Sequence, residues 1–234
     1  MDRNFARALA LVLKSEGLWS DNPADPGGAT MKGVTLATFR AYIKPGGTKA
    51  ELRAITDEQL STCYRRRYWD AVVGAELPDG VDYAVFDFGV NSGPGRAAKY
   101  LQSVVGAAQD GRIGPATIAA VKTKPAGVII DALCDARLAF LQRLPTWKTF
   151  GRGWSDRVRS VRADALKMTT QPASPAHVPV PKLFPDKPAV VVITEAGGIT
   201  ASPPGTATPA ATHVETNWLF RLLNALVGAI FRRK

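Results

Sequence analysis

The residues with the clearest chemical content lie near the N-terminus, where Glu16, Asp25 and Thr30 follow one another closely. They flank a loop rich in proline and glycine, with the sequence "SDNPADPGGAT". Acid-assisted cleavage of a glycosidic bond needs a carboxyl that carries a proton beside the leaving oxygen. It also needs a second polar group, or a held water, on the other face of the sugar. These three residues offer both parts, so glycosidic bond cleavage is the first chemistry to consider.

The segment before Glu16 indicates how this carboxyl is positioned. Phe5, Leu9 and Val12 recur at helical spacing together with Leu13, and Glu16 is the next member of the series. A carboxyl at the core end of an apolar stripe is partly desolvated, which favours the protonated form that a general acid needs. The alternative is that Glu16 turns to solvent at the helix end or pairs with one of the many arginines.

Other catalytic classes lack their usual residues in the body of the chain. Both histidines, His177 and His213, fall in a stretch rich in proline and threonine. A Ser-His relay and a histidine-based metal site are therefore disfavoured. A calcium loop is also disfavoured, because Pro23 stands between Asp21 and Asp25 where an oxygen ligand would be needed. We expect neither a metal nor another cofactor.

Helical patterns dominate the first two thirds of the chain, which predicts a mainly α fold. A capping box, "TDEQ" at 56–59, opens a helix that continues through Tyr68 and Trp69. Between Gly28 and Thr35 the sequence allows at most a small hairpin. Apolar stripes predict further helices in "VDYAVFDFGVNSG", "RAAKYLQSVVG", "PATIAAVK" and "VIIDALCDARLAFLQRL", and in an arginine-rich segment from Trp154 to Lys167.

The composition changes abruptly at Thr169, where proline, alanine, threonine and valine begin to dominate. This composition predicts a disordered linker over 169–216. The last segment, 217–234, reads "NWLFRLLNALVGAIFRRK" and carries a narrow polar stripe on an otherwise apolar helix with a basic end. Because a bilayer span needs roughly 17 to 25 apolar residues, an amphipathic helix at an anionic membrane surface fits better. The alternative is that this helix folds back and packs on the body.

Size and charge set the broad class. A chain of 234 residues with 46% hydrophobic content can bury a sizeable core in one or two domains. Its formal net charge of +10 favours polyanionic partners, which include nucleic acid, an anionic membrane surface and an acidic wall polymer. Cys63 and Cys134 each lie among apolar residues with helical spacing, so we expect buried free thiols rather than a disulfide.

Five segments in continuous order resemble a known family. They are "SEGLWSDNPADPGGATMKGVT", "YRRRYWD", "VFDFGVNSG", "LQSVVGAAQDGRIGPAT" and "FGRGWSDRV", and the match extends from about Asn4 to Met168. This part of the chain resembles glycoside hydrolase family 108, the bacterial and phage N-acetylmuramidases. The resemblance implies a lysozyme-like catalytic region over 4–92 and a helical peptidoglycan-binding region over 93–168.

The resemblance also implies roles for individual residues. The glutamate of the family's Glu-Gly-Gly-like motif is the catalytic acid, and it corresponds to Glu16; Leu18 departs from the usual second glycine. The order of glutamate, aspartate and threonine is similar to the catalytic triad of phage-type lysozymes. By this weaker analogy Asp25 and Thr30 position the attacking water, with Thr35 as the competing threonine. Asp25 stands before Pro-Gly-Gly, however, where an aspartate often only forms a turn.

Four residues are candidates for binding the sugar. Tyr68 and Trp69 could stack on pyranose rings, although buried core aromatics are the commoner case, and Asn91 could bond N-acetyl groups. Asp87 lies on the same helical face as Asn91 and faces either the sugar cleft or only water. The arginines of the last predicted helix form a solvated face or a site for acidic stem peptides: Arg152, Arg157, Arg159 and Arg162.

These expectations describe a monomeric lysozyme that cleaves the β-1,4 bond between N-acetylmuramic acid and N-acetylglucosamine. The favoured context is a bacteriophage endolysin with antimicrobial action that lyses its host. The N-terminal apolar run is too short for a secretory signal. We therefore expect synthesis in the bacterial cytoplasm, action on the cell wall in the periplasm, and association with the inner membrane through 217–234.

Three other functions are alternatives to this one. A lytic transglycosylase would cleave the same polymer with a different product. A non-catalytic peptidoglycan-binding module would bind the wall without cutting it, but the presence of Glu16, Asp25 and Thr30 together counts against it. Nucleic-acid binding is suggested only by the basic charge, because the sequence contains no helix-turn-helix pattern, zinc spacing or aromatic RNA-binding signature.

Overall fold

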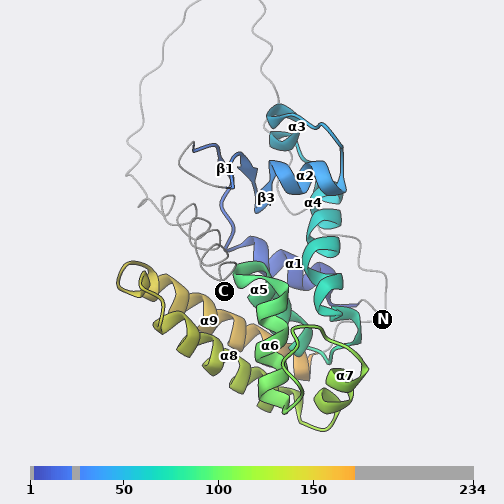
Figure 1. Cartoon of the computed structure of the whole chain (residues 1–234), viewed down its shortest axis with the longest axis vertical. Helices are drawn as coiled ribbons and strands as arrows, with labels where there is room; N and C mark the ends of the chain where they lie inside the picture. The colour runs from blue at the N-terminus through green and yellow to red at the C-terminus, as the bar shows by residue number, and fades with distance from the viewer. Residues whose placement is uncertain (1–2, 23–26, 172–234) are drawn as a thin grey trace, which may run out of the picture.

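The computed structural model describes residues 3–22 and 27–171. These residues form a mainly helical structure with one small antiparallel sheet, which confirms the predicted fold class (Figure 1). Most of the predicted linker, the amphipathic segment 217–234 and Asp25 lie outside the described residues. Within the described ranges, every helix is too short or too polar to cross a membrane.

The elements follow one another in a simple order. The strands are β1 (Trp19–Ser20), β2 (Thr30–Met31) and β3 (Val34–Thr35), which pair in the order β1-β2-β3. One π-helical turn, η1 (Arg65–Trp69), and two 3-10 turns, η2 (Asp70–Val72) and η3 (Gly74–Glu76), follow the fourth helix. The α-helices are α1 (Phe5–Leu13), α2 (Leu36–Tyr42), α3 (Lys49–Arg53), α4 (Asp57–Tyr64), α5 (Val81–Ser92), α6 (Pro94–Val105), α7 (Pro115–Lys122), α8 (Ala126–Gln142) and α9 (Trp147–Thr170).

The capping box predicted at 56–59 starts α4. The side chain of Thr56 accepts a hydrogen bond from the backbone N–H of Gln59, and the side chain of Gln59 accepts one from the backbone N–H of Thr56. Two of the N–H groups that a helix start leaves without an intrahelical partner are satisfied in this way. The predicted helix boundary is therefore confirmed at its N-terminal end.

The predicted hairpin is also confirmed, and it is anchored at its turn. Lys32 and Gly33 connect β2 and β3 with positive φ angles of 45° and 86°, as the two central residues of a tight hairpin turn require. The N–H of Lys32 donates to the carbonyl of Leu18 at 2.8 Å, and its own carbonyl accepts from the hydroxyl of Tyr64 at 3.0 Å. Its ammonium lies 3.7 Å from Asp57. The turn thus joins the sheet to α4 and to the loop after Glu16.

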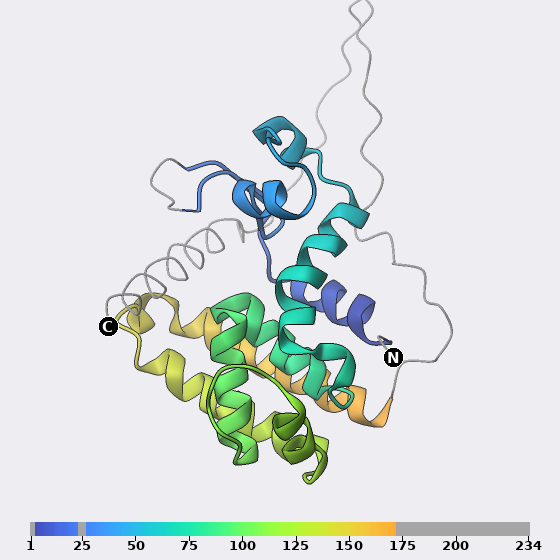
Figure 2. The same cartoon turned by 45° about the vertical axis from the view of Figure 1, so that its right-hand side comes forward.

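Helix α5 is the central element of the core. Ten of its twelve residues are buried, and it contacts α1, α6, α8 and α9. In Figures 1 and 2 the sheet with α2 and α3 lies at one end of the molecule and α7 lies toward the other, with α5 in between. One continuous set of buried apolar side chains extends from α1 to α9.

The start of α5 passes very close to α9. Gly80, the N-cap of α5, has a φ of +82°, and a Cβ there would collide with the carbonyl oxygen of Ala165 on α9. Only glycine accepts both the backbone angle and the close approach. This contact fixes the distance between the two helices at their shared end.

A buried carboxylate, Asp82, organises the first turn of α5. One of its oxygens accepts from the backbone N–H of Gly80 at 2.8 Å and of Tyr83 at 2.7 Å. The other accepts from the side-chain amide of Asn4 at 2.8 Å, which ties the start of α1 to α5. Burial raises the pKa of Asp82 to about 6, although the hydrogen bond from Asn4 opposes the shift.

This shift predicts a pH dependence of stability. Because the folded-state pKa of about 6 exceeds the unfolded value of about 3.9, the contribution of Asp82 is fully present below about pH 4 and lost as pH rises through 6. Relative to Asp82→Asn, the wild-type free energy of unfolding should fall by up to about 3 kcal/mol between pH 4 and pH 7. Urea unfolding of both proteins across this range tests it, and a constant difference would contradict it.

Candidate active site

Glu16 follows α1 on a tight turn. The stripe of Phe5, Leu9, Val12 and Leu13 is buried as predicted, and α1 ends at Leu13. The N–H of Glu16 then donates to the carbonyl of Leu13 at 3.2 Å, a three-residue step typical of a narrowing last turn. The Glu16 side chain is 13% exposed, so its carboxyl is largely removed from solvent but still reachable.

A charged group from the far end of the fold meets this carboxyl. Arg157, on α9, places its Nη1 3.3 Å from Oε1 of Glu16. The Arg157 side chain is only 9% exposed. The expectation that Arg157 belongs to a solvated face is therefore wrong. Of the alternatives for Glu16, pairing with an arginine is the one found in the structure.

Arg157 is itself held by Asp87 of α5. Its Nε lies 3.1 and 3.2 Å from the two Asp87 oxygens, and its Nη2 lies 2.9 Å from Oδ2. A second guanidinium, that of Arg137 on α8, donates to Oδ1 of Asp87 at 2.7 Å. Arg137 is 2% exposed and Asp87 is 1% exposed, so this is a buried charge cluster.

The charge cluster corrects the prediction for Asp87. The residue faces neither a sugar nor water, because two guanidiniums surround its carboxylate. Burial alone would raise the pKa of Asp87, but Arg157 and Arg137 outweigh it and hold the pKa below its ordinary value. In the same way burial lowers the pKa of Arg157, and the carboxylates of Asp87 and Glu16 raise it beyond its ordinary value. Asp87 and Arg157 thus favour each other's charged state.

The two threonine candidates lie on adjacent strands with different partners. Thr30 of β2 is fully buried and its hydroxyl donates to the carbonyl of Gly28 at 3.0 Å. Thr35 is the N-cap of α2, where its hydroxyl oxygen accepts from the N–H of Thr38 at 3.1 Å. Thr35 thus has a structural role as a helix cap. The described side-chain hydrogen bond of Thr30 is the one to Gly28, two residues away.

The sugar-binding candidates separate into buried and half-buried residues. Trp69 is 1% exposed and packs edge-on against Phe86 at 5.3 Å between ring centroids, so it offers no face to a sugar and that prediction is wrong. Tyr68 is half-buried, and its hydroxyl accepts from Nε of Arg67 at 3.2 Å. Asn91 is 7% exposed and accepts from the hydroxyl of Ser92 at 3.2 Å. Sugar binding by Tyr68 and Asn91 remains a prediction.

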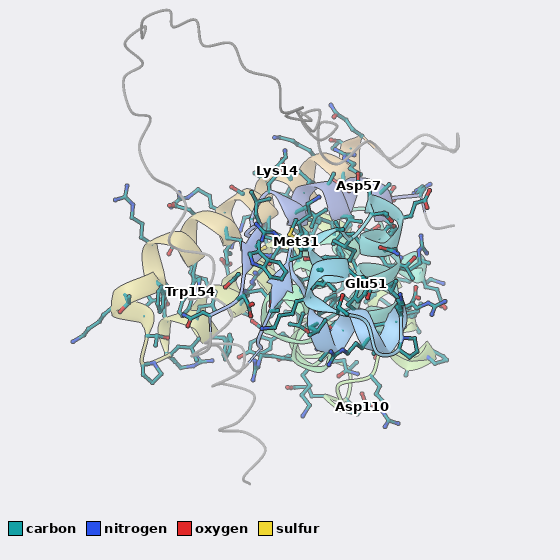
Figure 3. All side chains as sticks on the ribbon, turned by 90° about the horizontal axis from the view of Figure 1, so that it is seen from above. Lys14, Met31, Glu51, Asp57, Asp110 and Trp154 are labelled. Carbon is teal, nitrogen blue, oxygen red and sulfur yellow. The ribbon has the colours of Figure 1, made fainter. Side chains whose placement is uncertain are left out.

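An aromatic residue close to Glu16 escaped the sequence-based reasoning. Trp19 of β1 stands three residues after Glu16, is half-buried, and carries the guanidinium of Arg53 at 5.4 Å from its ring centroid. Trp19 pairs with Met31 of β2. Figure 3, seen from above, shows Met31 between Trp154 of α9 and Glu51 of α3. A tryptophan directly after the Glu-Gly-Leu segment was the sequence feature that could have identified Trp19 as a candidate.

Metal chemistry finds no support in the described part of the chain. Among residues 3–22 and 27–171, no three histidine, cysteine, aspartate or glutamate side chains are grouped so that they could hold a metal ion. Cys63 and Cys134 are both buried and free, as predicted. Burial raises the pKa of Cys63 to about 11, which keeps its thiol protonated at neutral pH.

Two family models match the chain. Residues 9–93 match the family model described as glycosyl hydrolase 108, and residues 96–159 match one described as a predicted peptidoglycan domain. Glu16 and Asp87 fall in the first match, and Arg137 and Arg157 in the second. Among curated proteins, none matches the sequence.

One solved structure is similar to most of the chain. The structure of Brucella abortus SagA is 48% identical, with a TM-score of 0.67, and the similarity covers 74% of this chain and 100% of that one. Its identity and its coverage are both high enough to define a family. The chain therefore belongs to the glycosyl hydrolase 108 family and is a glycoside hydrolase that acts on peptidoglycan.

Proposed function

We propose that the protein is an N-acetylmuramidase that cleaves the β-1,4 bond between N-acetylmuramic acid and N-acetylglucosamine, with Glu16 as general acid. The observation that carries the proposal is the position of Glu16. It is a carboxyl with 13% exposure at the end of α1, inside the segment that matches the glycosyl hydrolase model. A largely desolvated carboxyl that can still reach a substrate suits proton donation to a glycosidic oxygen.

In this mechanism Arg157 acts on Glu16 after proton transfer. Its Nη1 lies 3.3 Å from Oε1 of Glu16. After Glu16 has given its proton to the leaving oxygen, the nearby guanidinium stabilises the carboxylate that results. Asp25 and Thr30 are proposed to hold the water that attacks the sugar from its other face.

The two halves of the described fold take different parts in the proposal. Residues 4–92 form the catalytic region, and residues 93–168 form a helical region that binds the glycan. The second region also contributes Arg157 to the surroundings of Glu16. Tyr68 and Asn91 are proposed to contact the sugar, and Trp19 is added to them because it lies three residues from the acid.

The first test is Glu16→Gln. The amide has the shape of the carboxyl but cannot donate its proton to the leaving oxygen, so activity should fall by about 10²- to 10⁴-fold. Release of reducing ends from purified peptidoglycan measures activity, and thermal unfolding checks that the variant is folded. Retention of more than about a tenth of the activity would exclude Glu16 as the acid.

Mass spectrometry of the released fragments identifies the reaction itself. Reducing N-acetylmuramic acid ends support a muramidase. Anhydro ends would instead indicate a lytic transglycosylase, and wall binding without any released fragment would indicate a non-catalytic module. Either result would overturn the proposed function.

The second test concerns Asp25 and Thr30. Asp25→Asn and Thr30→Val should each lower activity while Glu16 stays intact, because each removes a partner of the proposed water. Asp21→Asn is a matched control in the same loop, since Asp21 is 36% exposed and pairs with Lys49. If Asp25→Asn changes the melting temperature but not activity at a temperature where the protein is folded, Asp25 is only a turn former.

We also propose a role in host cell lysis for a monomeric enzyme that meets an anionic membrane through 217–234. The support comes from the sequence, since this segment has an apolar face and a basic end. A protein that ends at Thr216 should no longer sediment with anionic vesicles, yet it should turn over isolated peptidoglycan as before. Loss of thermal stability in the shortened protein, with no vesicle binding by the full chain, would show that the segment packs on the body.

A further inference from the structure

An arginine lies over the aromatic ring of Trp19, three residues after Glu16. We propose that this arginine, Arg53, is a specificity-determining residue that binds a carboxylate on the side arm of N-acetylmuramic acid. The carboxylate belongs either to the lactyl group of that sugar or to the acidic peptide attached to it. The inference rests on the proposed function, because it requires muramic acid to bind next to Glu16.

The chain between Glu16 and Trp19 is open to solvent and fixed in place. Leu18 is 67% exposed, and Trp19 is half-buried. Three residues of chain span at most about 11 Å, so a sugar that adjoins the cleaved bond can reach Trp19. The carbonyl of Leu18 accepts from the N–H of Lys32 at 2.8 Å. Trp19 itself pairs with Met31 in the sheet. The ring therefore has a defined position beside the proposed acid.

Helix α3 brings Arg53 to this ring. A capping box fixes the start of α3, where the side chains of Thr48 and Glu51 each accept from the backbone N–H of the other. Leu52 is fully buried and fixes the face that α3 turns toward the core. Arg53 follows it and is exposed, with its Cζ 5.4 Å from the ring centroid of Trp19. Figure 1 shows α3 and β1 at the same end of the molecule.

The other charged side chains of α3 are already paired. Lys49 donates to both carboxylate oxygens of Asp21 at 3.0 Å, and Glu51 has an ion pair and its capping contacts. Within residues 3–22 and 27–171, Arg53 has no recorded hydrogen bond or carboxylate partner, and its described contact is the ring of Trp19. A guanidinium over an aromatic face keeps the N–H groups at its rim available, and their planar arrangement suits a carboxylate.

A carboxylate is what distinguishes the two sugars of peptidoglycan. N-acetylmuramic acid differs from N-acetylglucosamine by a lactyl ether, whose carboxyl is either free or linked to a peptide with acidic residues. The pyranose ring and the N-acetyl group are uncharged in both sugars. A guanidinium with unused donors beside the glycan site therefore selects muramic acid through its side arm, because only that sugar supplies the anion.

The first experiment measures binding without catalysis. The indole N–H signal of Trp19, assigned by its absence in Trp19→Phe, is followed by ¹H–¹⁵N NMR as each of three ligands is added. N-acetylglucosamine has no carboxylate, N-acetylmuramic acid has the lactyl carboxylate, and N-acetylmuramoyl-L-alanyl-D-isoglutamine has one on its peptide. At least one acidic ligand should bind with a Kd about fivefold lower than that of N-acetylglucosamine. The ligand that does so identifies the source of the carboxylate.

Arg53→Gln should remove this preference, because the amide is polar but carries no positive charge. Its Kd for the preferred acidic ligand should rise about fivefold, toward the value for N-acetylglucosamine. Lys49→Gln is the matched control, since it removes a positive charge from the same helix that is already paired with Asp21. This control should keep the preference. Thermal unfolding checks that both variants are folded.

The second experiment measures turnover of purified peptidoglycan. Arg53→Gln should lower kcat/KM about fivefold, chiefly through a higher KM, whereas Lys49→Gln should leave it unchanged. The same polymer is then treated with a carbodiimide and ammonia, which converts its carboxylates to amides. The wild-type protein and Arg53→Gln should hydrolyse this amidated polymer equally well, because neither has an anion to bind.

Three results would overturn the inference: equal wild-type affinity for all three ligands, an unchanged preference in Arg53→Gln, or an equal loss in Lys49→Gln. None of them bears on Glu16 as the acid. If Glu16→Gln instead stays active, the proposed function fails, whereas the titrations still test whether Arg53 binds a carboxylate. The comparison of ligands on the wild-type protein decides the matter even if a variant does not fold.

Discussion

The structure depends on the burial of two guanidinium groups inside a helical core. Arg137 is 2% exposed and Arg157 is 9% exposed, a placement that is costly unless each charge finds a partner. Asp87 compensates both, and Glu16 takes part of the remaining charge. Arg137 also lies over the ring of Phe88, with 5.1 Å from its Cζ to the ring centroid. For all these contacts to form at once, α5, α8, α9 and the end of α1 must meet at one place.

The aromatic core holds the start of α1 against α5. Phe5, the first residue of α1, packs against Trp69 with 5.4 Å between ring centroids, and Trp69 packs in turn against Phe86 of α5. Trp69 thus supports the helix whose end carries Glu16, although it is too deeply buried to bind a sugar. At the start of α5, Gly80 sets the close approach of α9. The position of Arg157 therefore depends both on helix packing and on charge compensation.

Local patterns predicted the helices well but not the cluster they form. The apolar stripe before Glu16, the capping box at 56–59 and the small hairpin depend on neighbours in sequence, and all three are confirmed. Arg157 lies 141 residues after Glu16 and 70 after Asp87, and a periodic arginine-rich helix gives no sign of which arginine turns inward. Asp87 did carry a signal, since a carboxylate within "YAVFDFGV" requires a buried partner.

The distance in sequence between Glu16 and Arg157 has a consequence for synthesis. A ribosome makes Glu16 early and the two arginines late, since Arg137 follows Asp87 by 50 residues and Arg157 follows Glu16 by 141. Domains fold during translation from the N-terminal side. A nascent chain that has produced only its first half therefore carries Glu16 without the guanidinium that orients it. The surroundings of Glu16 are complete only when α9, the last described helix, has left the ribosome.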